Sequence, residues 1–140
     1  MTDIQAALGL SQMHRLDDFI SIRNELANRY DELLKGLPIE IPYQTPEYLS
    51  ARHLYIIKIN NAKNHQHVFE GMREYGIGVN IHYIPVHLQP YYKKMGHKTG
   101  DYPIAERHYS KAISIPLYTQ LEHSQQDKVL RALKELFPTQ

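Results

Sequence analysis

The stretch GIGVNIHYIPVHLQPYY, residues 76–92, decides how the rest of this chain is interpreted. From Val79 to Tyr83 apolar and polar side chains alternate, which is typical of a β-strand with one buried face. The second half is a loop stiffened by two prolines that also carries histidine and tyrosine side chains. Because ligands dock where strands end in α/β proteins, this loop is the first candidate for a functional surface.

A second strand and a helix precede this stretch. Residues His53–Asn60 are rich in tyrosine and isoleucine and apolar on both faces until Lys58, so we expect a strand that is covered on both sides. Asn64 can cap a helix that ends at Gly76, with the apolar stripe Val68, Phe69, Met72 and Tyr75. The order strand, helix, strand predicts a βαβ-type unit, with a right-handed crossover if the two strands are parallel.

The N-terminal quarter of the chain predicts one long helix. Thr2 and Gln5 form a capping-box pattern, apolar residues recur at helical spacing as far as Leu34, and Gly36 stands where a C-terminal cap belongs. Such a helix would be about 50 Å long, whereas a domain of this size is roughly 37 Å across. We therefore expect its first half to overhang the domain and to pack against structure outside this chain. The alternative is a kink near Gly9 or Asp17 that folds the helix back.

The remaining segments complete a small layered domain. Residues 37–50 read as an irregular linker with a short extended piece at residues 39–41. Pro103 suits the first turn of a helix, and a last helix spans about Glu122–Phe137. Between them a third strand follows from Ile113, and Pro116 indicates that it is an edge strand or stops there. The predicted fold class is α/β, of an α+β-like two-layer kind, with a long N-terminal helix before a mainly three-stranded sheet packed with helices.

Composition excludes several functions. The 140 residues contain no cysteine, which removes disulfides, thiolate metal sites and cysteine nucleophiles. Sixteen basic and fifteen acidic residues leave a net charge of +1 with no basic block, so neither nucleic acid nor a membrane surface is an expected partner. No apolar run approaches the roughly 20 residues of a membrane span, and no leader peptide pattern follows Met1. We expect a cytoplasmic protein.

Two histidines carry the chemical interest of the loop. His82 lies on the polar side of its strand near the C-terminal end, and His87 follows five residues later. Donors without nearby carboxylates suit an anionic or polyhydroxylated ligand. Either histidine could instead be a partly buried polar residue satisfied by the backbone. A zinc site is a further alternative, although no cysteine or well-spaced carboxylate completes a ligand set. From the residues alone, no full catalytic set is present.

Several ordered motifs resemble one enzyme family. The runs MTDIQAALGLSQM, RLDDFISIRNELANRY, HLYIIKI, GIGVNIHYIPVHLQPYY, GDYPIAE and ISIPLY are similar to the C-terminal part of the DegT-type sugar aminotransferases. Within that family, HYIPVH most resembles transaminases of UDP-linked 4-keto-6-deoxy hexosamines. These act in surface-polysaccharide and pseudaminic-acid-type pathways, as does the enzyme that forms UDP-4-amino-4,6-dideoxy-N-acetyl-altrosamine.

The resemblance implies a pyridoxal-phosphate enzyme of the aspartate-aminotransferase fold. It moves an amino group from glutamate to a nucleotide-linked keto-sugar, with a UDP-sugar favoured, and it works as a homodimer. Residues 1–36 would be the interdomain helix and residues 37–140 the small C-terminal domain. The larger N-terminal domain, which holds the Schiff-base lysine and the cofactor, has no counterpart in this chain. The chain alone is therefore expected to be inactive, with no catalytic, cofactor-binding or metal-binding residues of its own.

Carried over residue by residue, the motif HYIPVH implies a nucleotide-sugar site. Its substrate-binding residues would be His82, Tyr83, Ile84 and Pro85, with His87 as a second-line contact. One departure is Arg52, where many family members place an aromatic residue, and this leaves the local packing open.

Two other functions remain open on sequence grounds. The chain could be a stand-alone, non-catalytic domain that binds a nucleotide sugar or a partner. It could also belong to a pyridoxal-phosphate-dependent sugar dehydratase, because the lysine that separates transaminases from dehydratases lies outside the chain.

Overall fold

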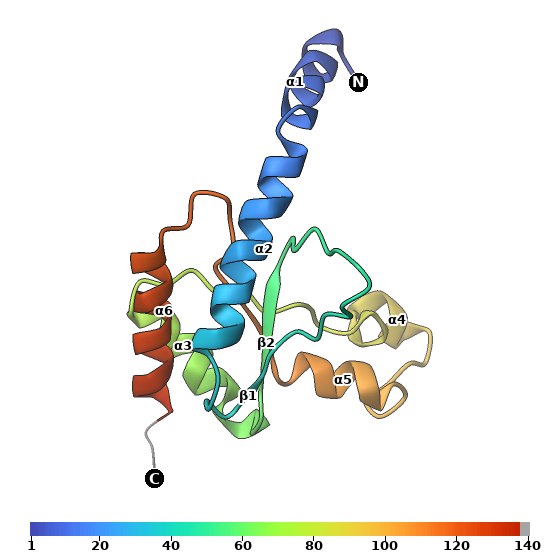
Figure 1. Cartoon of the computed structure of the whole chain (residues 1–140). Coiled ribbons are helices and arrows are strands. Elements are labelled where there is room, and N and C mark those ends of the chain that lie inside the picture. The colour runs from blue at the N-terminus through green and yellow to red at the C-terminus, as the bar shows by residue number, and fades with distance from the viewer. Residues whose placement is uncertain (138–140) are drawn as a thin grey trace.

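The computed structural model describes residues 1–137 of the chain (Figure 1). The helices are α1 (Asp3–Met13), α2 (Leu16–Leu33), α3 (His65–Glu74), α4 (Pro90–Lys94), α5 (Pro103–Tyr109) and α6 (His123–Leu136). Short 3₁₀ turns are formed by η1 (Ala62–Asn64) and η2 (Val86–Leu88). The strands are β1 (Ile39–Glu40), β2 (Tyr55–Ile59) and β3 (Ala112–Ile115).

The three strands form one antiparallel sheet in the order β1-β2-β3. Ile39 pairs with Ile59 on one side of β2, and Tyr55 pairs with Ile115 on the other. The predicted βαβ unit is therefore wrong. Residues 79–83 form no strand, because Asn80 alone exchanges hydrogen bonds with Ser114 before the chain turns away. The prediction that the third strand is an edge strand or stops at Pro116 is confirmed, since β3 lies at one edge of the sheet and ends one residue before Pro116.

The core lies where helices cover the sheet. In Figure 1, α3 and α6 lie on one side of the strands, and α4 and α5 lie on the other. Alternate residues of β2 are fully buried, whereas Ile56 and Lys58 between them are half-buried, so only one face of β2 is completely covered. The largest fully buried side chains come from α2, the sheet, α3 and α6 and include Tyr30, Tyr55, Ile57, Met72, Ile113 and Leu133.

The long N-terminal helix is two helices. A turn at His14 and Arg15 separates α1 from α2, with the Arg15 N–H donating to the Gln12 carbonyl at 3.0 Å. The expectation of one uninterrupted helix is wrong, and so is the alternative of a helix folded back on the domain. Figure 1 shows α1 continuing away from the domain beyond the end of α2. A single 3₁₀-type turn redirects the axis without reversing it.

The first helix has no buried residue. Its capping box forms as predicted, because the Thr2 hydroxyl accepts from the Gln5 N–H and the Gln5 side chain accepts from the Thr2 N–H. Ile4 is 83% exposed, and Leu8 and Leu10 are similarly open. An exposed apolar stripe of this kind marks a surface that packs against another protein surface.

Local caps agree with the sequence in part. Gly36 and Gly76 adopt positive φ after α2 and α3, as predicted for terminating glycines. Asn64 stands at the N-terminus of α3, but its side chain makes no capping bond. Asn61 caps the preceding 3₁₀ turn instead, with its side-chain oxygen accepting from the Lys63 N–H.

Two arginines join α2 to the sheet. The Arg23 guanidinium donates to the carbonyls of Arg52, His53 and Leu117 at 3.0–3.3 Å. The side chain of Arg52 is buried 4.0 Å from the Asp31 carboxylate, which also accepts from the Tyr55 hydroxyl. Burial and the Asp31 carboxylate raise the pKa of Tyr55, so its hydroxyl remains a donor. The charge of Asp31 partly balances the buried Arg52 guanidinium, whose Nε has no hydrogen-bond partner among the described residues.

Within residues 1–137, no helix combines the length and the apolar character needed to cross a membrane.

Candidate functional site

A pocket of about 630 Å³ opens between residues 82–85 and the start of α5. We call it the His82 pocket. It is lined by His82, Tyr83, Pro85, Asp101, Tyr102, Pro103, Ile104, Ala105 and His108. The fold brings together two segments that are almost 20 residues apart in sequence. Three of the five residues predicted to bind substrate therefore share one wall of one pocket.

His82 is the least satisfied polar side chain of this pocket. Both of its ring nitrogens are buried, and neither has a hydrogen-bond partner among the described residues. The ring stands edge-on to the ring of Tyr83, with centroids 4.5 Å apart. The reading of His82 as a polar residue satisfied by the backbone is therefore wrong. Buried nitrogens without partners are costly, and a ligand hydroxyl or anionic oxygen would remove that cost.

The neighbours of His82 differ in their roles. Tyr83 is 72% exposed, so its ring and hydroxyl are available to a ligand, whereas Pro85 is buried and forms the base of the wall. A cis peptide joins His82 to Tyr83. Ile84 is half-exposed and does not line the pocket, and its carbonyl accepts from the Gln89 side chain. The structure thus separates Ile84 from the other predicted contacts.

His87 is buried behind the pocket wall. Its Nε2–H donates to the Glu106 carboxylate at 2.9 Å, because a carboxylate can only accept. It lines a smaller cavity on the other side of Pro85 and does not reach the His82 pocket. The reading of His87 as a residue satisfied by the backbone is also wrong, since its partner is a side chain.

Glu106 links the two segments that form the walls of the His82 pocket. The same carboxylate oxygen that receives His87 also accepts from the Gly100 N–H at 2.8 Å. These hydrogen bonds, first that of Gly100 and then that of His87, hold the pKa of Glu106 below its usual value. Sequence reasoning missed this residue. The only signal was its place at the end of the GDYPIAE run, 19 residues after His87.

Replacing Glu106 with glutamine is expected to remove a pH dependence of stability. The pKa of Glu106 is lower in the folded chain than the ordinary value of 4.5, so its carboxylate stabilises the fold above that pH. This contribution disappears as the pH falls through the folded pKa. Thermal midpoints between about pH 3 and 7 should therefore show a gap between the native chain and Glu106→Gln that closes in acid.

Two controls sharpen this measurement. Glu106→Ala removes the acceptor as well as the charge and should lower the midpoint at every pH, while glutamine retains an oxygen for His87 and Gly100. Glu74→Gln changes an exposed carboxyl on α3 and should leave the profile unchanged. A gap between the native chain and Glu106→Gln that does not vary with pH would contradict the role of the charge.

The second wall adds residues that the sequence did not suggest. Asp101, Tyr102, Ile104 and His108 enter the pocket from α5 and the turn before it. None of the nine lining residues is a lysine or an arginine, so this pocket offers neither an amine for an aldimine nor a fixed cation for a phosphate. The lining of this pocket thus does not fit a site that holds pyridoxal phosphate unaided. No group of three metal-ligating side chains occurs within residues 1–137 either.

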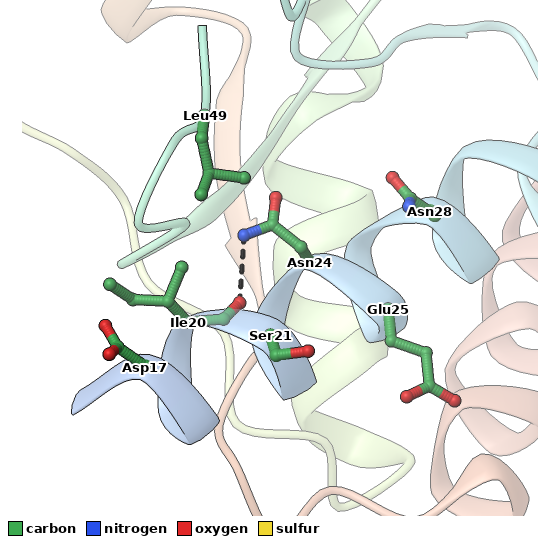
Figure 2. Close-up of a pocket in the computed structure, with 7 residues that line it drawn as sticks. All are labelled: Asp17, Ile20, Ser21, Asn24, Glu25, Asn28 and Leu49. Atoms are coloured by element: carbon green, nitrogen blue, oxygen red, sulfur yellow. Dashed lines mark hydrogen bonds between the residues drawn. The ribbon is translucent and has the colours of Figure 1, made fainter. Parts of the chain in front are cut away.

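A second pocket, of about 620 Å³, runs along the outer face of α2 (Figure 2). Its lining comprises Asp17, Ile20, Ser21, Asn24, Glu25, Asn28 and Leu49. Figure 2 shows six of these residues spaced along one helix with Leu49 above them, and the Asn24 side chain donates to the Ile20 carbonyl at 2.9 Å. Leu49 is the only lining residue outside α2, and the lining of this second pocket includes no histidine or aromatic side chain. The His82 pocket is therefore the better candidate site.

Comparisons with known proteins find similarity along nearly the whole chain. The profile of the DegT/DnrJ/EryC1/StrS aminotransferase family matches residues 1–134. The spore coat polysaccharide biosynthesis protein SpsC of Bacillus subtilis is 36% identical over 142 residues, which cover 97% of this chain and 36% of SpsC. This chain thus spans about a third of the length of that relative.

Solved structures also match nearly the whole of this chain, which again covers about a third of theirs. The candidate sugar aminotransferase Spr1654 of Streptococcus pneumoniae, in its PLP form, matches with a TM-score of 0.91 and 31% identity over 97% of this chain and 36% of that chain. The match to Helicobacter pylori PseC, an aminotransferase involved in the biosynthesis of pseudoaminic acid, has a TM-score of 0.86 and 26% identity. It covers 98% of this chain and 38% of PseC.

Proposed function

The chain belongs to the DegT/DnrJ/EryC1/StrS aminotransferase family, and on that premise we propose that it is the substrate-contacting C-terminal part of a sugar aminotransferase. Its helices and small antiparallel sheet have the aspartate-aminotransferase-like fold of its structural neighbours. The proposed reaction transfers an amino group from glutamate to a nucleotide-linked 4-keto-6-deoxy sugar for surface polysaccharide. A UDP-sugar is favoured by the HYIPVH motif, which resembles that of transaminases acting on UDP-linked sugars.

The observation that carries this proposal is His82. His82 lines a pocket together with Tyr83, whose side chain is exposed, and both ring nitrogens of His82 are buried without a hydrogen-bond partner among the described residues. A nucleotide-linked sugar offers hydroxyl and phosphate oxygens that match such groups. His108 and Asp101 on the opposite wall add further polar groups, while Pro85 and Ile104 supply apolar surface.

In the proposed complex this chain binds and orients the sugar. His82 hydrogen-bonds a ligand oxygen, and Tyr83 packs its ring beside the sugar and offers its hydroxyl. The apolar surface of Pro85 and Ile104 displaces water from the bound ligand, which strengthens the polar contacts. Pyridoxal phosphate supplies the amino-transfer chemistry when it is bound. We assign its lysine to the large domain of the complete enzyme, and the chain alone is proposed to be inactive.

The proposed function also implies how the chain is divided into domains. We propose that residues 1–36 connect the two domains and that residues 37–140 form the small domain. The exposed apolar stripe of α1, which includes Ile4 and Leu8, supports this division because it can pack on a large domain or on a second subunit of a homodimer.

Replacing His82 with alanine is expected to weaken binding of a nucleotide sugar to this chain by about tenfold or more. One lost hydrogen bond to a charged or polar ligand group accounts for a change of this size. The affinity for UDP-N-acetylglucosamine can be measured by NMR titration of the ¹⁵N-labelled chain. Tyr83→Ala should weaken binding as well.

The matched control is His53→Ala, which changes an exposed histidine outside the pocket and should bind as the native chain does. Equal affinities for native chain, His82→Ala and His53→Ala would contradict the proposed site.

A further inference from the structure

Two adjoining cavities share residues 76–78, on the side of the sheet where α3 and α6 lie (Figure 1). The first, of about 360 Å³, lies between the end of α3 and residues 76–80. The second, of about 350 Å³, lies between residues 76–78, residues 116–121 and the first turns of α6. We call this pair of cavities the Gly78 site. It shares no lining residue with the His82 pocket.

The backbone at Gly78 is open because strand pairing ends beside it. Asn80 and Ser114 exchange two backbone hydrogen bonds, of 2.8 and 3.2 Å. In the same antiparallel register Gly78 would face Pro116, which has no N–H to donate. Gly78 therefore makes no backbone hydrogen bond with the described residues, and a Cβ added to it would meet nothing within 4 Å. Its N–H is free to bind a ligand.

Each cavity contains one cation without an anionic partner. Arg73 lines the first cavity and Lys128 lines the second. Both side chains are exposed, and neither takes part in the ion pairs found within residues 1–137. No aspartate or glutamate lines either cavity. The lining thus has positive charge that no carboxylate of the lining balances.

Both cations are held near the open segment. The Arg73 guanidinium lies over the Phe69 ring, 5.6 Å from its centroid. Lys128 comes close because residue 76 is a glycine, since a Cβ at Gly76 would lie 3.7 Å from the Lys128 Nζ. Capping of α3 does not require these cations, because the carbonyls of residues 71–73 already accept from the backbone N–H groups of residues 75–77.

Gln125 adds a neutral donor to the second cavity. Its side-chain oxygen accepts from the Glu122 N–H at 2.9 Å and from the Tyr118 hydroxyl at 3.3 Å. This arrangement fixes which end of the amide is oxygen and leaves the NH₂ group for a ligand, because an amide nitrogen can only donate. The Gly78 site therefore combines two cations with neutral N–H donors.

From these observations we propose that the Gly78 site binds a phosphate group, either free or carried by a small phosphorylated molecule. Arg73 and Lys128 attract its charge, and the Gly78 N–H and the Gln125 amide donate to its oxygens. A phosphate carries a larger negative charge and more acceptor oxygens than a carboxylate, so it matches this set of donors better. The site lies outside the proposed sugar site, and the inference does not depend on the proposed function.

The test is an NMR titration of the ¹⁵N-labelled 140-residue chain with inorganic phosphate, at constant ionic strength so that screening does not change. Phosphate should shift the backbone amide signals of Gly76, Gly78 and Lys128 and leave those of Tyr83 and Ile104 in place. Acetate should bind at least about fivefold more weakly. Glucose 6-phosphate separates the two sources, because it binds at least as tightly as inorganic phosphate only if the site accepts a carried phosphate.

Charge variants test the two cations. Lys128→Gln and Arg73→Gln should each weaken phosphate binding by about fivefold or more. Lys134→Gln is the matched control, because it removes the same charge from an exposed position of α6 that lines neither cavity. It should bind phosphate as the native chain does. Equal losses in Lys128→Gln and Lys134→Gln would show general attraction to α6 and would overturn the site.

A third variant tests the site without changing its charge. Gly78→Val adds bulk in open space, and the fold should accept it because Gly78 is not among the glycines with positive φ. We expect weaker phosphate binding. Native affinity in this variant would overturn the proposed contact with Gly78. The site would also be overturned by acetate that binds as tightly as phosphate, by shifts confined to Tyr83 and Ile104, or by no shift at residues 76–80 with millimolar phosphate.

Discussion

Replacing Ile57 with alanine is expected to lower the free energy of unfolding of this chain by about 3–4 kcal/mol. Ile57 lies in the middle of the central strand β2 and has no exposed surface. The substitution removes buried methyl and methylene groups and leaves a cavity, because the surrounding residues are held by strand pairing and by helix packing. A loss of this size is a large part of the 5–15 kcal/mol that stabilises a typical domain.

Urea denaturation followed by far-UV circular dichroism measures this change. Ile104→Ala is the matched control, since the same atoms are deleted from a side chain that is 80% exposed on α5. The control should change stability by less than about 0.5 kcal/mol. Similar losses at both positions would contradict the assignment of the core to β2 and its neighbours.

Replacing Leu8 with aspartate is expected to convert a self-associating chain into a monomer. No residue of α1 is buried, and its exposed apolar side chains include Ile4, Leu8, Leu10 and Met13. Such a surface associates with other copies when its natural covering is missing. An aspartate in the contact would have to give up its hydration, which costs far more than the apolar contacts restore.

Sedimentation velocity over a range of chain concentrations measures this effect. Leu49→Asp is the matched control, because Leu49 is 79% exposed but lies on the segment between β1 and β2. It should leave association unchanged. A native chain that remains monomeric at high concentration would contradict the prediction, and dissociation by Leu49→Asp alone would move the contact to that segment.

Taken together, the two predictions describe a chain with a well-packed core and an exposed apolar helix α1. The core comes from the sheet and from α2, α3 and α6, whereas the candidate ligand site lies on the other side, between residues 82–85 and α5. Binding at that site can therefore be changed through His82 or Tyr83 without opening the core around Ile57. This separation allows the binding variants to be interpreted without a large loss of stability.

The helices and their ends were predictable from local sequence. Helical spacing of apolar residues located the segments that became α2, α3 and α6, and the Thr2 capping box and the glycine after α3 formed as expected. A kink near Asp17 was one alternative on sequence grounds, but the turn at Arg15, which does not fold the helix back, was not predictable. Its backbone bond differs from a helical one by a single residue, and no proline or glycine marks it.

The candidate site was predictable only as a location. The motif HYIPVH led to His82, Tyr83 and Pro85, which do line one pocket, and also to Ile84 and His87, which do not. Glu106 and Tyr102 were missed because their roles depend on neighbours brought close by the fold. The bond between His87 and Glu106 spans 19 residues, and no local pattern pairs a histidine with a carboxylate at that distance.

By itself, the sequence determined the family, most helix positions and one half of the candidate site, because these depend on spacing and motifs within short windows. Tertiary structure alone decided that the sheet is antiparallel, since β2 finds its partner in residues 112–115, more than 50 positions later. It also decided which polar groups are satisfied. His87 meets a carboxylate, whereas His82 meets none, and that difference comes from distances between segments that a linear sequence does not contain.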